Sequence, residues 1–194
     1  QEVTDDFFAE AKRMLQDSEP VFQLDRFDDH GKWMDGWESR RKREPGHDCA
    51  VIQLGARGII RGVEIDTRYF TGNFPPQASL QGLDRRSGKT HSQEKWEDLI
   101  PISNLGPDQQ HFFSIDGPRT FTHLRLNIFP DGGIARLRVY GEPMPLWSEI
   151  DVSQILELSS IALGGRIVGY NDAHYGIPWV ILTSGRGINM GDGW

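Results

Sequence analysis

Apolar and polar residues alternate through the middle of the chain, as in β-strands that bury one face. The clearest case is Thr120–Phe129, in which Leu124 and Leu126 share one face with Ile128. Similar short runs recur, each bounded by Gly, Pro, Asn or Ser, and they predict seven strands: Ala50–Leu54, Gly58–Phe70, Ser79–Asp84, Trp96–Ile102, His111–Ile115, Thr120–Phe129 and Ile134–Tyr140. Many short strands at close spacing indicate an all-β sandwich or barrel rather than alternating strands and helices.

The segment Pro130–Gly133 separates the last two predicted strands. Because Pro fixes φ and Gly accepts a positive φ, this segment predicts a hairpin turn. Helical spacing of apolar residues occurs only towards the two ends of the chain. It predicts a short helix or helical turn within Phe7–Leu15 and a second one at Val152–Leu158.

Two short motifs near the start of the chain return near its end. Met34–Trp37 returns as Met190–Trp194 with one inserted residue, and Asp5–Ala9 resembles Asp172–Gly176. The paired motifs keep their order, although the spacing between them differs. A period of this length indicates a duplicated domain rather than a solenoid.

Composition removes several classes of protein. The chain has 194 residues, enough for one domain or for one domain and a fragment, and its net charge of −7 argues against nucleic acid as a partner. A single cysteine, Cys49, excludes an internal disulfide. No apolar run approaches the ~20 residues that a membrane span needs, and no signal-peptide pattern is present, so we expect no membrane partner.

The densest polar motif is Asp35–Arg43, followed closely by Gly46–Asp48. Four consecutive basic residues, Arg40–Arg43, stand here in an acidic protein. Because the guanidinium group grips a carboxylate with two parallel hydrogen bonds, this run is a candidate anion site. The structural alternative is a solvated basic face. His47 beside Asp48 is a candidate general base or metal ligand, or simply part of a turn.

A second polar motif, Glu64–Asn73, lies where a predicted strand runs into a loop, a common location for functional groups. Asp66 or Glu64 could act as a base, and Asn73 could bind a carbonyl or a urea-like group. The alternative is a capped strand end. Elsewhere the chain has no zinc-ligand spacing, no phosphate-binding glycine loop before a helix and no nucleophile elbow.

The sequence resembles the allantoicase family. The stretches that carry this resemblance are Asp35–Arg43, Gly46–Asp48, Gly62–Thr67, Phe70–Pro76, Leu124–Gly141, Asn171–Gly176 and Gly185–Trp194. They cover nearly the whole chain in the family's order. One departure is Cys49, which stands where the family usually carries Trp after His-Asp.

The resemblance implies an all-β fold: jelly-roll β-sandwiches of the galactose-binding-like type, in tandem. Residues 1–142 would form the first repeat, residues 143–158 a linker, and residues 159–194 the start of a second, truncated repeat. The implied enzyme is a hydrolase of carbon–nitrogen bonds in linear amidines. It would convert allantoate and water to ureidoglycolate and urea, in the purine (allantoin) degradation pathway.

Allantoate carries one carboxylate and two ureido groups, and expelling urea requires proton transfer and charge stabilisation. We therefore expect Asp66, Glu38 and His47 to act in catalysis. We expect Arg40 and Arg41 to hold the carboxylate. Asn73 and Arg136 are expected to bind the ureido oxygens, and Trp37 is expected to form the wall of the pocket.

We also expect no cofactor and no bound metal, a small-molecule substrate, a homo-oligomer and a cytoplasmic or peroxisomal location. The alternative function is a non-catalytic jelly-roll module that binds a carbohydrate or another ligand, because fold alone does not determine function. We also expect Ile161–Tyr170 to form the opening strand of the second repeat. Since an unpaired sheet edge is costly, this strand would pair with the first sandwich or with another molecule.

Overall fold

The computed structural model describes residues 2–85, 95–151, 153–187 and 189–194. Within these ranges the regular elements are strands and short 3₁₀ helices. In chain order they are β1 (Glu2–Val3), η1 (Ala11–Leu15), β2 (Phe27–Asp28), β3 (Gly31–Lys32), β4 (Trp37–Glu38), β5 (Asp48–Asp66), β6 (Gln77–Leu83), β7 (Glu97–Asn104), β8 (Gln110–Ser114), β9 (Thr120–Phe129), β10 (Gly133–Ile134), β11 (Arg136–Pro143), η3 (Trp147–Glu149), η4 (Ile161–Leu163) and η5 (Pro178–Leu182).

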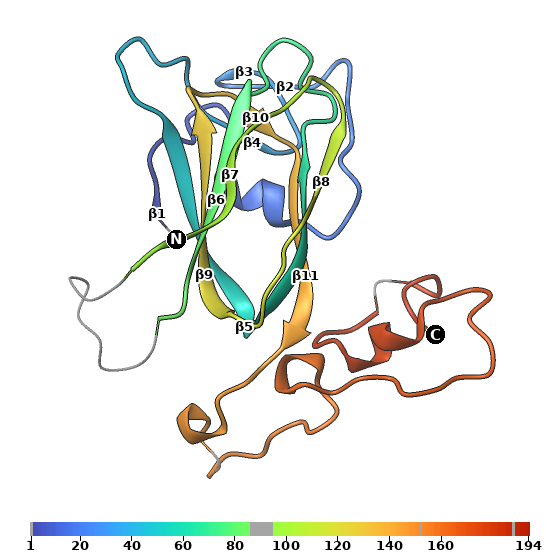
Figure 1. Cartoon of the computed structure of the whole chain (residues 1–194). Coiled ribbons are helices and arrows are strands. Elements are labelled where there is room, and N and C mark those ends of the chain that lie inside the picture. Colours follow the sequence, from blue (N-terminus) through green and yellow to red (C-terminus); the bar gives the residue numbers. More distant parts are fainter. Residues whose placement is uncertain (1, 86–94, 152, 188) are drawn as a thin grey trace.

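Strand β5 belongs to both layers of the molecule. Its first part pairs with β1 and β9, and β9 continues through β6 to β7. Its last part pairs with β11 on one side and with β8 on the other. The register with β9 shifts between Gln53 and Gly58, so the two strands predicted here are one bent 19-residue strand (Figure 1).

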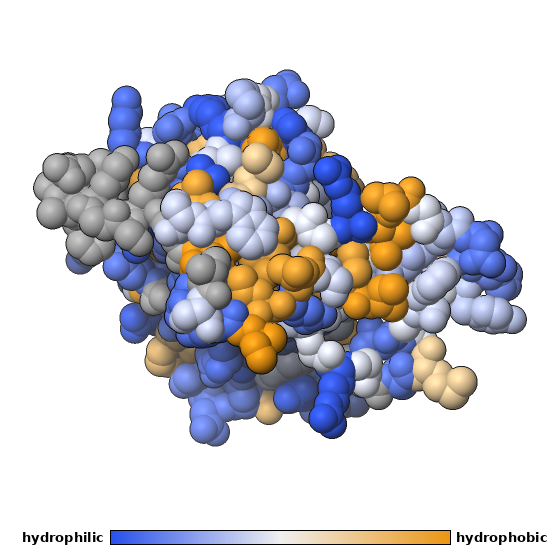
Figure 2. Space-filling view, turned by 90° about the horizontal axis from the view of Figure 1, so that it is seen from below, coloured by the Kyte–Doolittle hydropathy of each residue, from blue (hydrophilic) through white to orange (hydrophobic). Residues whose placement is uncertain are grey.

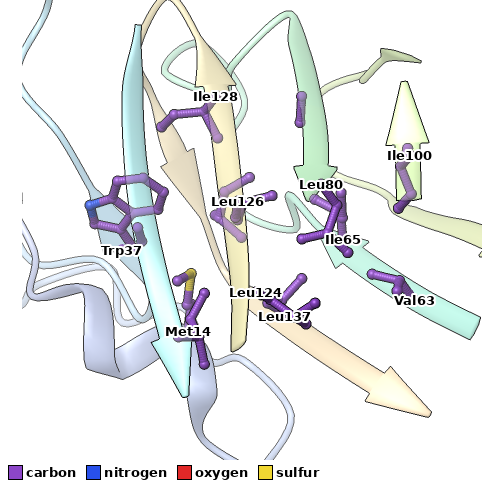
Figure 3. Packing of buried hydrophobic residues seen from close by; sticks show 14 of the residues in the cluster. Met14, Trp37, Val63, Ile65, Leu80, Ile100, Leu124, Leu126, Ile128 and Leu137 are labelled. Carbon is purple, nitrogen blue, oxygen red and sulfur yellow. The ribbon is translucent and has the colours of Figure 1, made fainter. Parts of the chain in front are cut away.

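The core lies between the two layers, as the alternating pattern predicted. Leu124, Leu126 and Ile128 of β9 are fully buried. Trp37 and Met14, which come from the chain before β5, pack into the same cluster (Figure 3). Burying each side chain of this size stabilises the fold by about 1.5–3 kcal/mol. The alternation therefore fixes which face of β9 turns inward.

The hairpin predicted at Pro130–Gly133 is wrong. Strands β9 and β11 do not pair with each other: both pair with β5, while β10 pairs with β4. The glycines serve a different purpose, which is to let the chain cross the end of the sandwich at close range. A Cβ atom on Gly133 would lie 2.0 Å from the Phe70 ring, and one on Gly132, where φ is +140°, would lie 2.5 Å from the nitrogen of Pro75.

Near the N-terminus the predicted helical turn is confirmed as η1, which buries Ala11 and Met14. The helix predicted at Val152–Leu158 is wrong for residues 153–158, which are irregular, and Val152 lies outside the described residues. The strand predicted at Ile161–Tyr170 is wrong as well. Ser160 caps η4 and Gly164 ends it in the left-handed region, so this segment forms a helical turn and makes no ladder with the sandwich.

The repeated motifs make matching contacts. We call residues 5–37 the opening segment and residues 172–194 the closing segment. In the opening segment the indole Nε1 of Trp37 donates to the backbone oxygen of Asp5 at 2.8 Å. In the closing segment Nε1 of Trp194 donates to the backbone oxygen of Asp172 at 2.6 Å.

Other local features of the two segments also match. Each aspartate side chain accepts a hydrogen bond from the backbone N–H two residues later. The ring pairs Phe7–Phe8 and His174–Tyr175 are both T-shaped, with interplanar angles of 81° and 85°. The five-residue 3₁₀ helices η1 and η5 each begin the same number of residues after their ring pair in the sequence. The sequence similarity therefore extends to local conformation.

The surroundings of the closing segment differ from those of the opening segment. It belongs to the irregular region below the sandwich (Figure 1), and apolar side chains gather on that lower face (Figure 2). Exposed apolar residues in this region include Ile155, Leu158, Val168, Ile181 and Met190. Among the described residues, no helix has the length and hydropathy that a membrane crossing requires.

Candidate active site

Three loops meet at the end of the sandwich that carries β4 and β10, opposite the closing segment (Figure 1). They follow β4, β5 and β9 in the sequence, and a hollow of about 540 Å³ opens between them. The side chains of interest that line it are Phe8, Glu38, Arg41, Lys42, Asn73 and Asp131. The structure thus brings together parts of three motifs that are far apart in the sequence.

Backbone hydrogen bonds hold the loops in place. Glu38 of β4 lies opposite Gly133 of β10, and the Gly133 N–H donates to the backbone oxygen of Asn73 at 2.7 Å. The Ser39 N–H donates to the Gly132 oxygen at 3.2 Å, while the Gly132 N–H donates to the Ser39 hydroxyl at 3.2 Å. These hydrogen bonds tie the three loops to one another and to the ends of β4 and β10.

Glu38 and Asn73 form the central pair of polar side chains. The Asn73 amide donates from Nδ2 to Oε1 of Glu38 at 2.6 Å. Burial raises the pKa of the Glu38 carboxyl, and the hydrogen bond from Asn73 offsets this effect only in part. A carboxyl group with a raised pKa keeps its proton at higher pH, which suits a general acid.

Two cationic side chains lie beside this pair. Arg41 is exposed and lines the hollow, and no carboxylate pairs with it in the described ranges. Lys42 is anchored through its backbone N–H, which donates to Oδ2 of Asp131 at 2.8 Å. The hollow therefore offers positive charge next to a carboxyl group that favours its neutral form.

Arg40 points elsewhere, although it is next to Arg41 in the sequence. Its guanidinium pairs with Oδ2 of Asp5 at 2.7 Å and lies 5.0 Å from the centre of the Phe7 ring. Burial alone would raise the pKa of Asp5, but hydrogen bonds from Arg40 and from the Phe7 N–H outweigh it and hold that pKa below its usual value. Arg40 thus fastens the opening segment to the chain after β4.

His47 also lies outside the hollow. Its ring is exposed and packs against Phe129, with 4.7 Å between ring centres. It borders a different hollow, of about 500 Å³, on the outer face of the sheet beside Arg125 and Asn127. The structure does not bring His47 to Glu38.

Asp66, Arg136 and Trp37 are fully buried and do not reach the hollow. Both oxygens of Asp66 accept hydrogen bonds from Arg68, including one from Nε to Oδ2 at 2.9 Å. Nη2 of Arg136 pairs with Oδ2 of Asp35 at 2.7 Å. Trp37 is part of the hydrophobic core. These side chains hold the framework behind the site together.

Among the lining residues that sequence reasoning missed are Phe8, Lys42 and Asp131. Lys42 belongs to the basic run and Asp131 to the turn after β9, so both were within motifs already singled out. The missing information was the crossing of the turn over the end of the sandwich. Among the described residues, no cluster of three His, Cys, Asp or Glu side chains is suitable for holding a metal ion.

Comparison with known proteins identifies the family. A family model described as the allantoicase repeat matches residues 1–144. The chain belongs to the allantoicase family. All three loops around the hollow fall within the matched residues, so the candidate site lies in the allantoicase repeat itself.

Two curated relatives are similar over the whole chain. A probable allantoicase of Acinetobacter baylyi is 53% identical over 193 residues, which make up 100% of this chain and 57% of that protein. A probable allantoicase of Pseudomonas aeruginosa is 52% identical over 99% of this chain and 58% of its own length. The chain therefore spans less than two thirds of the length of these relatives.

A solved allantoicase structure confirms the fold class. The crystal structure of the Saccharomyces cerevisiae allantoicase matches with a TM-score of 0.77 and 34% identity, over 100% of this chain and 58% of that one. The chain is thus an all-β jelly-roll sandwich, as expected for the family.

Proposed function

We propose that the protein to which this chain belongs hydrolyses allantoate to ureidoglycolate and urea in purine degradation. Whole-chain identity of 53% to a probable allantoicase is the observation that carries this proposal. The hollow around Glu38 and Asn73 supports it, because it combines a proton donor, an amide and positive charge. These are the groups that a carboxylate with two ureido substituents needs.

In this proposal Glu38 gives its proton to one ureido nitrogen as the bond between that nitrogen and the central carbon breaks and urea leaves. Water adds to the central carbon and returns a proton to the Glu38 carboxylate, which yields ureidoglycolate. The raised pKa of Glu38 favours the protonated form that such a step requires. The Asn73 amide lies within hydrogen-bonding distance of Glu38 and positions the carboxyl group while its own oxygen accepts from a ureido N–H. Arg41 binds the substrate carboxylate, for which its planar group is suited.

The other candidates take supporting roles in the proposal. Asp66 and Arg136 are buried in ion pairs, and Trp37 is in the core, so they keep the site rigid without touching substrate. Arg40 is engaged with Asp5, and His47 faces a neighbouring hollow. The proposal therefore needs no direct contact between any of these five residues and allantoate.

The division into a first repeat at residues 1–142, a linker at 143–158 and the start of a second repeat at 159–194 is part of the same proposal. The matching contacts of the opening and closing segments support it. A homo-oligomer, with a small molecule as its substrate and with a cytoplasmic or peroxisomal location, is the corresponding expectation for the whole protein.

The test is urea release from allantoate by the protein at the full length of its relatives. Glu38→Gln should lower kcat by roughly 10²–10⁴-fold with little change in KM, because it removes the proton donor and keeps the shape. Glu44→Gln, an exposed neighbour outside the hollow, is the matched control and should behave as the wild type. Absence of urea release together with specific glycan binding would instead support a carbohydrate-binding module.

A further inference from the structure

A buried carboxylate lies directly behind the hollow. Asp48, the first residue of β5, is 1% exposed, and its Oδ1 lies 2.6 Å from the ammonium Nζ of Lys42. The Thr4 hydroxyl donates to the same oxygen at 2.8 Å. The other oxygen, Oδ2, is buried and has no hydrogen-bond partner in the part of the chain that the structure describes. A buried polar atom without a partner is rare and calls for an explanation.

The pairing explains the position of Lys42. Nearly all of Asp48 is inaccessible, and its charge is compensated by the ammonium group of Lys42, which itself lines the hollow. The lining of the hollow includes Lys42, whose side chain is 27% exposed, and does not include Asp48. Since an ammonium has three N–H donors and Asp48 accepts from one of them, donors remain for an anion on the open side.

The main chain fixes both ends of this arrangement. The Asp48 N–H donates to the Pro130 oxygen at 3.1 Å, and the Lys42 N–H donates to Asp131 at 2.8 Å. The backbone of Lys42 is thus tied to the turn after β9, and its ammonium to the start of β5. A long, flexible side chain would otherwise lose several rotatable bonds of freedom whenever it bound a ligand.

We propose that Lys42 recognises the carboxylate of the ligand and that Asp48 is a positioning residue that holds the Lys42 ammonium against the hollow. The identity of the ligand, a small ureido acid, rests on the proposed function. The binding step does not depend on turnover and can be measured separately. Lys42 and Arg41 would both bind the ligand carboxylate, which would then lie between two cations.

The experiment is ligand-observed NMR titration of the 194-residue chain with two probes: allantoate, and allantoin, a neutral cyclic ureide without a carboxylate. Lys42→Met should weaken the affinity for allantoate by roughly 10–100-fold, the range of a hydrogen bond to a charged group. It should leave the affinity for allantoin unchanged. Lys42→Arg should restore most of the binding. Arg43→Met, an exposed neighbour that does not line the hollow, should bind both probes as the wild type does.

Asp48 is tested through its coupling to Lys42. Asp48→Asn should weaken allantoate binding by a smaller factor than Lys42→Met, and it should cause no further loss when Lys42 is already Met. The double variant also covers the case in which Lys42→Met alone does not fold, because it leaves no unpaired charge on the buried Asp48. If Asp48→Asn weakens allantoate binding by the same factor whether residue 42 is Lys or Met, Asp48 has a general structural role. That result would overturn the proposal that Asp48 positions Lys42.

Three further outcomes would overturn the recognition itself: allantoate affinity unchanged in Lys42→Met, an equal loss for both probes, or no binding of allantoate by the wild-type chain. If the proposed hydrolysis is wrong but the recognition by Lys42 is right, the result is different. In that case Lys42-dependent binding of allantoate persists, while the full-length protein releases no urea.

Discussion

The opening segment and the closing segment make the same local contacts in opposite surroundings. Trp37 is 0% exposed, whereas Trp194, which makes the matching hydrogen bond, is 55% exposed. The sandwich covers the first and leaves the second at the surface. The local sequence is therefore sufficient to specify the aspartate turn, the ring pair, the 3₁₀ helix and the tryptophan contact, and burial is added by the strands that pack on them.

This difference in burial changes how much each tryptophan hydrogen bond contributes to stability. In the core the Trp37 indole N–H must find a partner, because water cannot reach it. At the surface the Trp194 N–H exchanges one hydrogen bond for another with water, so the net gain is small. The opening segment leads directly into a paired strand, because Glu38 of β4 pairs with Gly133 of β10 and reaches the candidate site.

The largest effect should come from the two tryptophans. Trp37→Ala should lower the free energy of unfolding by about 3–5 kcal/mol, because it opens a cavity in the core. Trp194→Ala should change it by less than about 0.5 kcal/mol. Urea denaturation followed by circular dichroism measures both values. Equal losses would mean that the closing segment unfolds together with the sandwich, and the comparison would fail.

The paired aspartates should give the next effect. Asp35 is buried and pairs with Arg136, and its counterpart Asp192 is exposed. Asp35→Asn removes one partner of a buried ion pair and should cost about 3 kcal/mol. Asp192→Asn should stay within about 0.5 kcal/mol of the wild type in the same denaturation experiment. A loss of comparable size at Asp192 would show that its surroundings resemble those of Asp35.

Periodicity predicted the faces of the strands because it depends on the sequence alone. The inward side of β9 and the strand character of β6, β7 and β8 follow from it. It could not predict that Pro130–Gly133 crosses the sandwich instead of closing a hairpin. That choice depends on Phe70, which packs against Gly133 and is far away in the sequence.

The same limit applies to the candidate site. The motifs of Glu38 and Asn73 could be recognised from their residue types, and the fold brings these two together at 2.6 Å. Arg136 shows what a pattern cannot reveal. It falls on the polar face of β11 by alternation, yet it is fully buried, because Asp35 and several backbone oxygens accept its hydrogen bonds. A polar residue type does not tell a ligand-binding side chain from a buried ion pair.

Amide hydrogen exchange provides a smaller and more local comparison. Gln16 donates to Arg13 at the end of η1, and Thr183 donates to Val180 at the end of η5, at 3.4 and 3.2 Å. Because η1 packs on the core and η5 lies in the exposed region, the Thr183 amide should exchange at least ~100-fold faster once intrinsic rates are taken into account. Exchange read by NMR at one pH measures the ratio. Similar protection at both amides would contradict a difference in burial.

The smallest effect concerns Glu38, the first residue after the opening segment. Burial raises the pKa of its carboxyl in the folded chain, so the unfolded chain loses this proton first as the pH rises. The contribution of Glu38 to the free energy of unfolding is therefore complete below the usual glutamate pKa and declines as the pH rises through the raised value. Glu38→Gln cannot titrate, so the stability of the wild type relative to this variant should fall across that interval. Denaturation curves of both proteins at several pH values provide the measurement, and Glu44→Gln is the control for an exposed glutamate. A relative stability that increases with pH would mean that the folded state prefers the charged carboxylate, and Glu38 would then be unsuited to donate a proton to the leaving urea.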